Sequence, residues 1–393
     1  MNEMFALAPT PWMLTALSLL LLIAPSIGEP LHRRWHLPTK IIALLVALMA
    51  ATPLVAYAAI AVGALVHARS AWPTSKTGAV FLIVSAATAL GVPVMLAQGN
   101  LDVAFALSIL TIALRSGVMP LHIGVASLCD RATVVQTQQL ATGMALVFAH
   151  LRFLNDAELG DSIGPLLERY GAATALIAAL ITIVQTDMRG FYRGTLALHA
   201  GMLLAVLGSS ALGHPGGALM VAVTVGLALG GIGMMITSLE ERVGNASFSG
   251  PGGRVGAFPK LALAFAVFGF AGVAVPGTTG FIADDLVLHG LWMDNPASAI
   301  AIILSSAILA VATLIAYSRV FLGGNTPSRA PDLYPRERVI VAALVLVLIF
   351  LGLFPNVLLD PLYASFTIAQ KVEGNGFQYV QASYDAVAQL IRY

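Results

Sequence analysis

The sequence predicts an all-α polytopic membrane protein with about ten crossings and two broken transmembrane helices. Its 393 residues are 58% hydrophobic and only 10% charged, whereas soluble domains hold roughly 25% charged residues. Apolar runs recur along the chain, and most approach or exceed the roughly 20 residues that cross a bilayer core. Two further runs are interrupted by polar residues, Gly or Pro, which predicts helices that break inside the membrane.

Nine uninterrupted apolar runs account for most of the predicted crossings. In order, they are Trp12–Ser26, Ile41–Val66, Gly78–Ala97, Ala172–Val184, Leu196–Leu212, Ala218–Ile236, Leu261–Val275, Ala299–Leu322 and Val339–Phe354. The first run follows an acidic start at Glu3 and lacks the basic flank and small-residue cleavage site of a secretory signal. We therefore expect it to be a retained helix.

The two interrupted runs each break at a short polar segment. The first extends over Leu101–Leu114, breaks at "RSGVMPLHIG" (115–124) and resumes at about Ala132–Leu154. The second extends over Phe281–Trp292, breaks at "MDNP" and resumes at Ala297–Leu322. Each is either two helices or one broken helix.

The distribution of basic residues favours one broken helix in each case, because Lys and Arg collect on the cytoplasmic side. With ten crossings, twelve of the 20 Lys and Arg residues fall on one side and six on the other. If each break is instead counted as an extra crossing, nine Lys and Arg residues fall on one side of the membrane and eleven on the other. The chain is thus expected in the inner (cytoplasmic) membrane with both termini outside.

Composition also excludes several kinds of site. The formal net charge of +1 implies no nucleic-acid partner, and the absence of a P-loop or a GxGxxG after a strand predicts no nucleotide or other cofactor. The single cysteine, Cys129, has no internal disulfide partner. His32 and His36 share the spacing of a helical metal site but lie in a basic loop with no acid between them, so we expect no metal.

Four motifs, taken together, resemble one known membrane family. "RSGVMPLH" (115–122) resembles the Lys-x-x-x-x-Pro-x-His segment of the antiporter-like subunits of respiratory complex I and of Mrp-type cation/proton antiporters. "QTDMRGFYRGTLALHAGML" (185–203) resembles their Gln-Thr-Asp-x-Lys-Arg stretch, and "PGTTGFIADDLVL" (276–288) their Pro-Gly-x-x-x-Phe-x-Gly-Glu-Phe motif. "FLGLFP" (350–355) also fits. The likeness runs in order over about residues 101 to 360.

The resemblance implies inverted repeats in which buried charges at broken helices carry protons. It places Arg115 where the family has an essential lysine, His122 and His199 at its two histidines, and Asp284 at its Glu of Gly-Glu-Phe. It also divides the chain into N-terminal transmembrane helices (1–100), an antiporter-like core (101–360) with broken helices near 115–131 and 280–297, and an amphipathic tail (361–393). The tail carries an apolar stripe at helical spacing, formed by Phe377, Val380, Tyr384, Val387 and Ile391.

The sequence also departs from the family pattern. Arginine keeps its proton where lysine can titrate, so Arg115 can hold a charge or an anion but is a poor relay. The helices at 12–26, 41–66 and 78–97 contain no Asp or Glu to replace the family's upstream glutamate. "IGVAS" replaces Trp-Leu-Pro, and the helix at 218–238 lacks the expected Lys or His. The family's chain of Glu and Lys is therefore incomplete here.

Ionisable residues inside a membrane are costly, which makes them candidates for a transport path. The predicted proton or ion pathway consists of Asp284, Asp285, Arg115, His122, His199 and His289. Secondary candidates are Gln136, Gln139, His150, Asp187 and Arg189. The two aspartates point about 100° apart on a helix, so only one faces the bundle centre, and we expect it to be Asp284.

Each candidate also has a structural alternative. The aspartates can cap a helix start at a wet surface, and Arg115 can complement the negative end of a half-helix. Each histidine can simply bond a neighbouring helix. The glutamines, including Gln138, suit either a water-filled path or a polar packing seam. Arg189 and Arg193, four residues apart, favour a surface or an acidic partner.

These features predict a noncatalytic membrane subunit that conducts or gates protons in a larger complex, with a proton-translocating NADH:quinone oxidoreductase-like assembly as one setting. The expected partners are the bilayer, other membrane subunits, and protons or monovalent cations. An alternative is the membrane partner of a carbonic-anhydrase-like protein in proton-driven inorganic-carbon uptake. A second alternative is a scaffold that conducts nothing.

Overall fold

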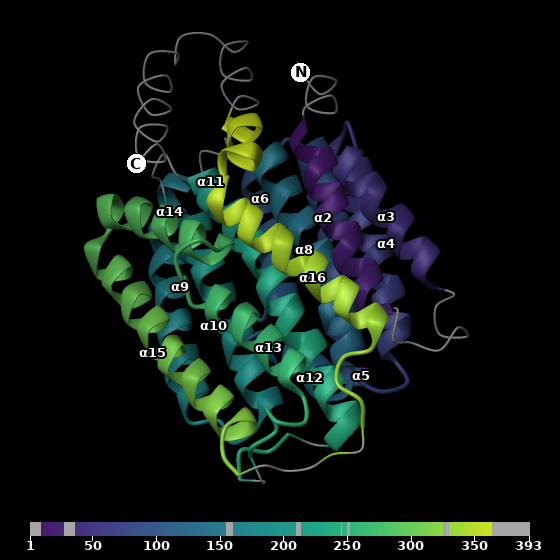
Figure 1. Cartoon of the computed structure of the whole chain (residues 1–393). Coiled ribbons are helices and arrows are strands. Elements are labelled where there is room, and N and C mark those ends of the chain that lie inside the picture. The colour runs from purple at the N-terminus through teal and green to yellow at the C-terminus, as the bar shows by residue number, and fades with distance from the viewer. Residues whose placement is uncertain are drawn as a thin grey trace.

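The computed structural model describes residues 9–26, 36–154, 160–209, 214–244, 246–249, 252–324, 328 and 330–363. Within these ranges the chain is helical and forms no strand, and its only strand-like pairing is an isolated bridge between Asp187 and Ser247. The all-α prediction is confirmed. The helices pack side by side into one bundle (Figure 1).

The helices follow one another from α2 to α16. Their bounds are α2 (Pro9–Ser26), α3 (Leu37–Met49), α4 (Pro53–Ala71), α5 (Lys76–Ala97), α6 (Leu101–Ser116), α7 (Ile123–Arg131), α8 (Thr133–Leu154), α9 (Gly160–Ile183), α10 (Met188–Gly208), α11 (His214–Thr224), the π-helical turn η2 (Val225–Leu229), α12 (Gly230–Val243), α13 (Pro259–Gly272), α14 (Thr279–Asp294), α15 (Pro296–Phe321) and α16 (Pro335–Leu353). A short helix, Asn356–Tyr363, follows α16 at an angle of 60°.

Six helical stretches in the described ranges are long and apolar enough to cross a membrane. They are α4, α5, residues 163–183 of α9, α10, the continuous stretch Pro215–Val243 and α15. Helix α16 and the short helix after it make a seventh if the bent pair is one span. These spans define a multi-pass membrane protein with a broken helix pair, but they do not confirm ten crossings or inverted repeats.

The apolar run at 41–66, expected as one segment, is divided between two helices. Helix α3 ends at Met49, and α4 begins at Pro53, whose missing amide hydrogen suits a first helical position. The hydroxyl of Thr52 accepts a hydrogen bond from the Val55 amide (3.4 Å) and caps α4.

Since α4 returns toward the start of α3, Arg69 near its C-terminus lies close to His36. Burial and the positive charges of Lys40 and Arg69 lower the pKa of His36.

The polar segment at 115–124 separates α6 from α7. Helix α6 stops at Ser116, and α7 starts at Ile123. Helix α8, expected as the second half of the broken helix, is a helix of its own that reverses direction after Ala132. Its far end is fixed by Arg152, whose Nη1 donates to the Ala50 carbonyl (2.7 Å) in the turn between α3 and α4.

The second irregular segment lies earlier than "MDNP". Helix α14 continues to Asp294, and Asn295 alone separates it from α15. The extended break is instead at 273–278, between α13 and α14. There Ala274 and Gly277 have φ values of 60° and 88°, in the left-handed region that ends a regular helix.

Positive charges gather at one end of the bundle, which we call the basic end. It is defined by Arg189, Arg193, Arg242 and Lys260. Arg193 Nη1 pairs with Asp130 Oδ2 (2.7 Å), and Arg242 Nη2 pairs with Glu337 Oε2 (2.7 Å). The Asp332 carboxylate accepts the Lys260 backbone N–H (2.9 Å). These contacts place residues of α7, α10, α12, α13 and α16 at the same end.

The opposite end of the bundle holds the ends of α10 and α14. There the Ser209 hydroxyl donates to Asp294 Oδ2 (2.6 Å). The start of α2 and the helix Asn356–Tyr363 also lie at this end (Figure 1). The amphipathic tail predicted for 361–393 lies outside the described residues except at 361–363, and His32 lies outside them too.

Candidate functional site: an interrupted helix beside a buried cavity

Arg115 lies in the last turn of α6, directly before the interruption. The helix stops because Gly117 adopts a φ of 94°, which favours glycine, and its N–H closes the helix on the Ala113 carbonyl. A cation in the last turn complements the negative end of the helix. Only 3% of Arg115 is exposed, so its charge lies inside the bundle.

The Arg115 side chain extends toward α8. Its Nη2 donates to the Thr142 hydroxyl, while its backbone carbonyl accepts a hydrogen bond from Gln139 Nε2 (2.9 Å). Both partners belong to α8, which thereby holds the interrupted end of α6. The Nε and Nη1 atoms of Arg115 are buried and have no hydrogen-bond partner.

The three neighbouring glutamines of α8 are all buried. Gln138 accepts a hydrogen bond from Lys40 Nζ (2.5 Å). The Oε1 atom of Gln139 and both side-chain polar atoms of Gln136 are buried without a partner. Buried polar atoms are normally satisfied by protein or by ordered water, so this part of α8 suits contact with water.

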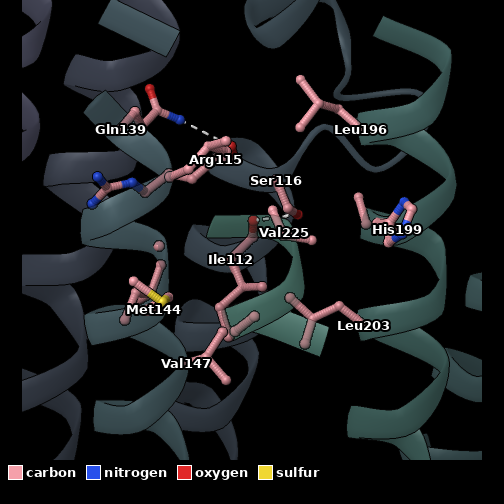
Figure 2. A pocket seen from close by; sticks show the side chains of 15 residues that line it. Ile112, Arg115, Ser116, Gln139, Met144, Val147, Leu196, His199, Leu203 and Val225 are labelled. Atoms are coloured by element: carbon pink, nitrogen blue, oxygen red, sulfur yellow. Dashed lines mark hydrogen bonds between the residues drawn. The ribbon is translucent and has the colours of Figure 1, made fainter. Parts of the chain in front are cut away.

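A cavity of about 40 Å³ opens beside these residues. Arg115, Ser116 and Gln139 line one side, and His199 of α10 lies on the opposite side (Figure 2). Since one water needs roughly 10–15 Å³ of this kind of space, the cavity has room for a few water molecules. Val225, in the π-helical turn, also lines it. Such turns frequently occur at functional sites.

His199 is 3% exposed, and its Nδ1 lies 2.9 Å from the Thr195 carbonyl, one turn earlier in α10. This contact fits a ring that donates from Nδ1, and the ring also contacts the backbone of Gly272 at the end of α13. His199 thus bonds within its own helix and contacts a neighbouring one, which is the structural alternative predicted for it, and its role as a relay stays a prediction.

His150 belongs to a separate buried network. Its Nδ1 lies 2.9 Å from the Ser108 hydroxyl, which lies 2.8 Å from the Tyr57 hydroxyl. The His150 ring also packs on Phe105, with the ring centroids 5.1 Å apart. This network joins α4, α6 and α8, but none of its members lines the cavity.

The two aspartates of α14 have different surroundings. Asp284 is half-buried, and its Oδ2 accepts a hydrogen bond from the Ser306 hydroxyl of α15 (2.9 Å). Asp285 and His289 are exposed on the outside of the described chain. Asp284 thus faces a neighbouring helix, but the structure does not bring it to the cavity.

The remaining predicted residues lie at helix starts. His122 directly precedes α7, and its Nδ1 is buried without a hydrogen bond. Asp187 caps α10 by accepting the Gly190 amide (2.8 Å). Arg189 pairs with Glu240 (Nη2 to Oε2, 2.7 Å) and also donates to the Asp130 carbonyl. The chain itself therefore supplies acidic partners for Arg189 and Arg193.

Sequence reasoning missed several buried ionisable residues, among them Lys40, His67 and Glu168. They are 4%, 0% and 3% exposed, respectively. Lys40 was expected in a basic loop, although the apolar run that follows it was a signal for burial. His67 and Glu168 carry no motif that would have distinguished them. Within the described ranges no three His, Cys, Asp or Glu side chains are arranged to hold a metal ion.

The fold and site define a multi-pass membrane protein in which a helix is interrupted beside a buried cation. A family model described as NADH:quinone oxidoreductase/Mrp antiporter, transmembrane, matches residues 44–310. The chain therefore belongs to this family. The suspected resemblance to the antiporter-like subunits is confirmed.

Named relatives match part of the chain. NADH-quinone oxidoreductase subunit M of Mycobacterium tuberculosis is 31% identical over 204 residues, which are 50% of this chain and 36% of that protein. NADH-ubiquinone oxidoreductase chain 4 of Mycosarcoma maydis is 24% identical over 266 residues, 65% of this chain and 54% of that protein. The alignments thus span about a third to a half of these relatives.

Solved structures share the fold over nearly the whole chain. A chain of respiratory complex I from Thermus thermophilus superposes with a TM-score of 0.78 at 20% identity, covering 91% of this chain and 83% of that chain. A chain of the Mrp complex from Dietzia sp. DQ12-45-1b gives a TM-score of 0.77 at 16% identity, covering 97% and 85%. Both neighbours belong to multisubunit membrane complexes.

Proposed function

We propose that the chain is the membrane subunit of an ion-translocating complex, in which it conducts or gates protons in response to a partner module. One observation carries the proposal. The interrupted end of α6 and the middle of α10 line the same buried cavity, to which Arg115, Gln139 and His199 all contribute. Irregular backbone at membrane depth is tolerated where it lines a wet cavity, and it is typical of transport sites.

The cavity residues would have different roles in proton transfer. Water held by the unpaired Oε1 atom of Gln139 would form the local proton path. His199 would exchange a proton with that water, because histidine titrates nearest neutrality. Arg115 keeps its charge and would act as a fixed barrier to cations. A movement that displaces its guanidinium would then open the path, which suits gating by a partner subunit.

The arrangement of the helices favours inverted repeats. The pair α6–α7 ends at the basic end, where Asp130 meets Arg193, whereas α13–α14 starts at that end and finishes at Asp294. The two interrupted pairs therefore run in opposite directions, as inverted repeats require. We infer twelve passes rather than ten, because α3 and α4 run in opposite directions, as do α7 and α8. Asp284 would serve the second repeat.

We also propose that the basic end faces the cytoplasm and that the protein lies in the inner membrane, by the positive-inside rule. Both termini would then be outside, since the start of α2 and the helix Asn356–Tyr363 lie at the opposite end (Figure 1). The partners would be further membrane subunits, as in the complexes that contain the structural neighbours. No described residue favours a carbonic-anhydrase-like partner over a redox one.

The test is proton flux through the full chain, in the complex with which it is isolated, after reconstitution into vesicles containing a pH-sensitive dye. His199→Leu should lower flux about tenfold or more, because a positioned proton-transfer group contributes on the order of 10²–10⁴ in rate. His289→Leu is the matched control. The same residue type is exposed on α14 there, so flux should stay near wild type.

Equal flux in His199→Leu and wild type, with both proteins correctly assembled, would remove the cavity from the path and favour the scaffold alternative. Identifying the co-purifying subunits by mass spectrometry would distinguish a redox assembly from a carbon-hydrating one. These two measurements are independent. A conducting subunit with an unexpected partner would therefore still be recognised.

A further inference from the structure

Three basic side chains approach one another inside the membrane between α3, α4, α6 and α8. Lys40, His67 and Arg115 come from three different helices and are 4%, 0% and 3% exposed. The charges of Lys40 and Arg115 both act on His67. Lys40 and Arg115 also contact α8 one turn apart, at Gln138 and Thr142, and residues at this spacing are neighbours on one helix face.

Carboxylates are missing from the helices that surround this cluster. The sequences of α3, α4, α5 and α8 contain no Asp or Glu. In α6 the sole acid is Asp102, which is exposed and thirteen residues from Arg115, about 20 Å along a helix. Among the three ion pairs formed by the described residues, none includes Arg115.

Arg115 is the member of the cluster that most needs a negatively charged partner. A guanidinium does not lose its proton in a protein, and an isolated charge in a low-dielectric interior is strongly unfavourable unless it is paired. Here Nε and Nη1 are buried without a partner, and only Nη2 is bonded, to a neutral hydroxyl. His67 is similar, since neither of its ring nitrogens makes a hydrogen bond of ordinary geometry. The cluster therefore lacks a negatively charged partner.

We propose that a small monovalent anion of the halide class binds beside the Arg115 guanidinium. The size follows from the space available. The guanidinium extends away from the cavity and toward α8 (Figure 2), where Nη2 meets Thr142. Because Arg115 is only 3% exposed there, a small ion fits beside the guanidinium and larger organic anions are excluded. Lys40 adds positive charge from α3. The anion would replace the carboxylate that these helices lack.

The proposal is independent of proton conduction and is tested by binding. The full chain, purified in detergent in sodium gluconate, is titrated with radioactive chloride in a scintillation proximity assay. Saturable binding of one chloride per chain is expected, with competition by bromide but not by gluconate. Chloride should also raise the thermal unfolding temperature with the same concentration dependence, because a ligand that binds only the folded state stabilises it.

Three variants locate the anion. Arg115→Gln should abolish saturable binding, whereas Arg115→Lys, which keeps a positive charge at this position, should retain it. Arg152→Gln is the matched control, because Arg152 is an arginine at the other end of α8 that contacts the Ala50 carbonyl. It should bind chloride like wild type.

No saturable chloride binding to the wild-type chain would overturn the proposal without any variant. Binding that is unchanged in Arg115→Gln would overturn it as well, since the anion would lie elsewhere. If Arg115→Gln does not fold, His67→Leu provides a second measurement. It removes one buried donor without removing a charge, and it should weaken chloride binding, so unchanged affinity in that case would contradict the site.

Discussion

Arg115 and Asp284 illustrate how the setting of one ionisable side chain decides its role. Both belong to interrupted helix pairs, but Arg115 is buried with two unpaired donor atoms, whereas Asp284 is half-buried and bonded to Ser306. A carboxylate with one neutral donor can still take up a proton, because no fixed positive charge holds it ionised. We therefore expect Asp284 to carry protons and Arg115 to hold charge.

This difference predicts unequal effects for the two adjacent aspartates. Asp284→Asn should lower proton flux in reconstituted vesicles about tenfold or more, because the amide cannot exchange a proton. Asp285→Asn should leave flux near wild type, since Asp285 is exposed on the outer face of α14. Equal losses in the two variants would show that the buried face of α14 has no special part in transport.

The individual side chains could be predicted only in part. The spacing of Asp284 and Asp285 indicated that one of them faces inward, and the motif around Arg115 drew attention to the interrupted helix. Neither feature revealed the pairing of Lys40 with Gln138, which lie 98 residues apart. That contact depends on where α3 packs against α8, and a single sequence does not specify it.

At the scale of the helices, α9 and α10 form a close pair through small residues. A Cβ atom added to Gly201 would lie 2.5 Å from the Ala175 amide nitrogen and 2.6 Å from the Gly171 carbonyl oxygen, both backbone atoms of α9. Glycine permits this approach, as in other membrane helix pairs that associate through small residues. The pair fixes His199 relative to the cavity, because His199 and Gly201 are on the same helix.

The packing predicts that Gly201→Ala destabilises the protein. Overpacking typically costs about 1–3 kcal/mol, and backbone atoms cannot move aside as a side chain can. Thermal unfolding of the purified protein should show a lower midpoint. Gly143→Ala in α8 is the control, because no atom lies within 4 Å of its added Cβ, and its midpoint should be equal or higher. Similar midpoints for both variants would refute the close α9–α10 contact.

The positions of the interruptions were harder to predict than the helices themselves. Polar residues, Gly and Pro occur both at a break inside a span and at a turn between two spans. The segment "MDNP" is a one-residue turn at Asn295, whereas 273–278 is the extended break. Pro53 likewise begins a new helix within an apolar run. Hydropathy alone does not distinguish these cases, because all of these segments are flanked by apolar residues.

At the scale of the whole molecule, charge is distributed unequally between the two ends. The ion pairs of Arg189, Arg193 and Arg242 all lie at the basic end. Helices α8 and α10 are buried over nearly their whole length, while α5 and α15 expose apolar side chains such as Val80 and Leu314. The exposed faces are suited to contact with lipid or a neighbouring subunit, and the buried helices α8 and α10 line the cavity.

This asymmetry predicts which end is reached from each side of the membrane. The single cysteine, Cys129, is buried, so an added exposed cysteine can be labelled selectively. With a membrane-impermeant maleimide, Ser249→Cys should react only in inside-out vesicles, because it lies at the basic end. Asn100→Cys, at the start of α6, should react only in right-side-out vesicles. The reverse pattern would invert the proposed orientation.

Hydropathy and short motifs were sufficient to predict an all-α, multi-pass membrane protein of an antiporter-like family, because both are properties of contiguous residues. The positions at which the chain turns back, and the cavity shared by His199 and the end of α6, follow only from tertiary packing. The tertiary structure also showed that Lys40 and His67 lie near Arg115 without a carboxylate in α3, α4, α5 or α8. These outcomes depend on which helix faces pack together, and the free energy of that packing is shared among residues far apart in the chain.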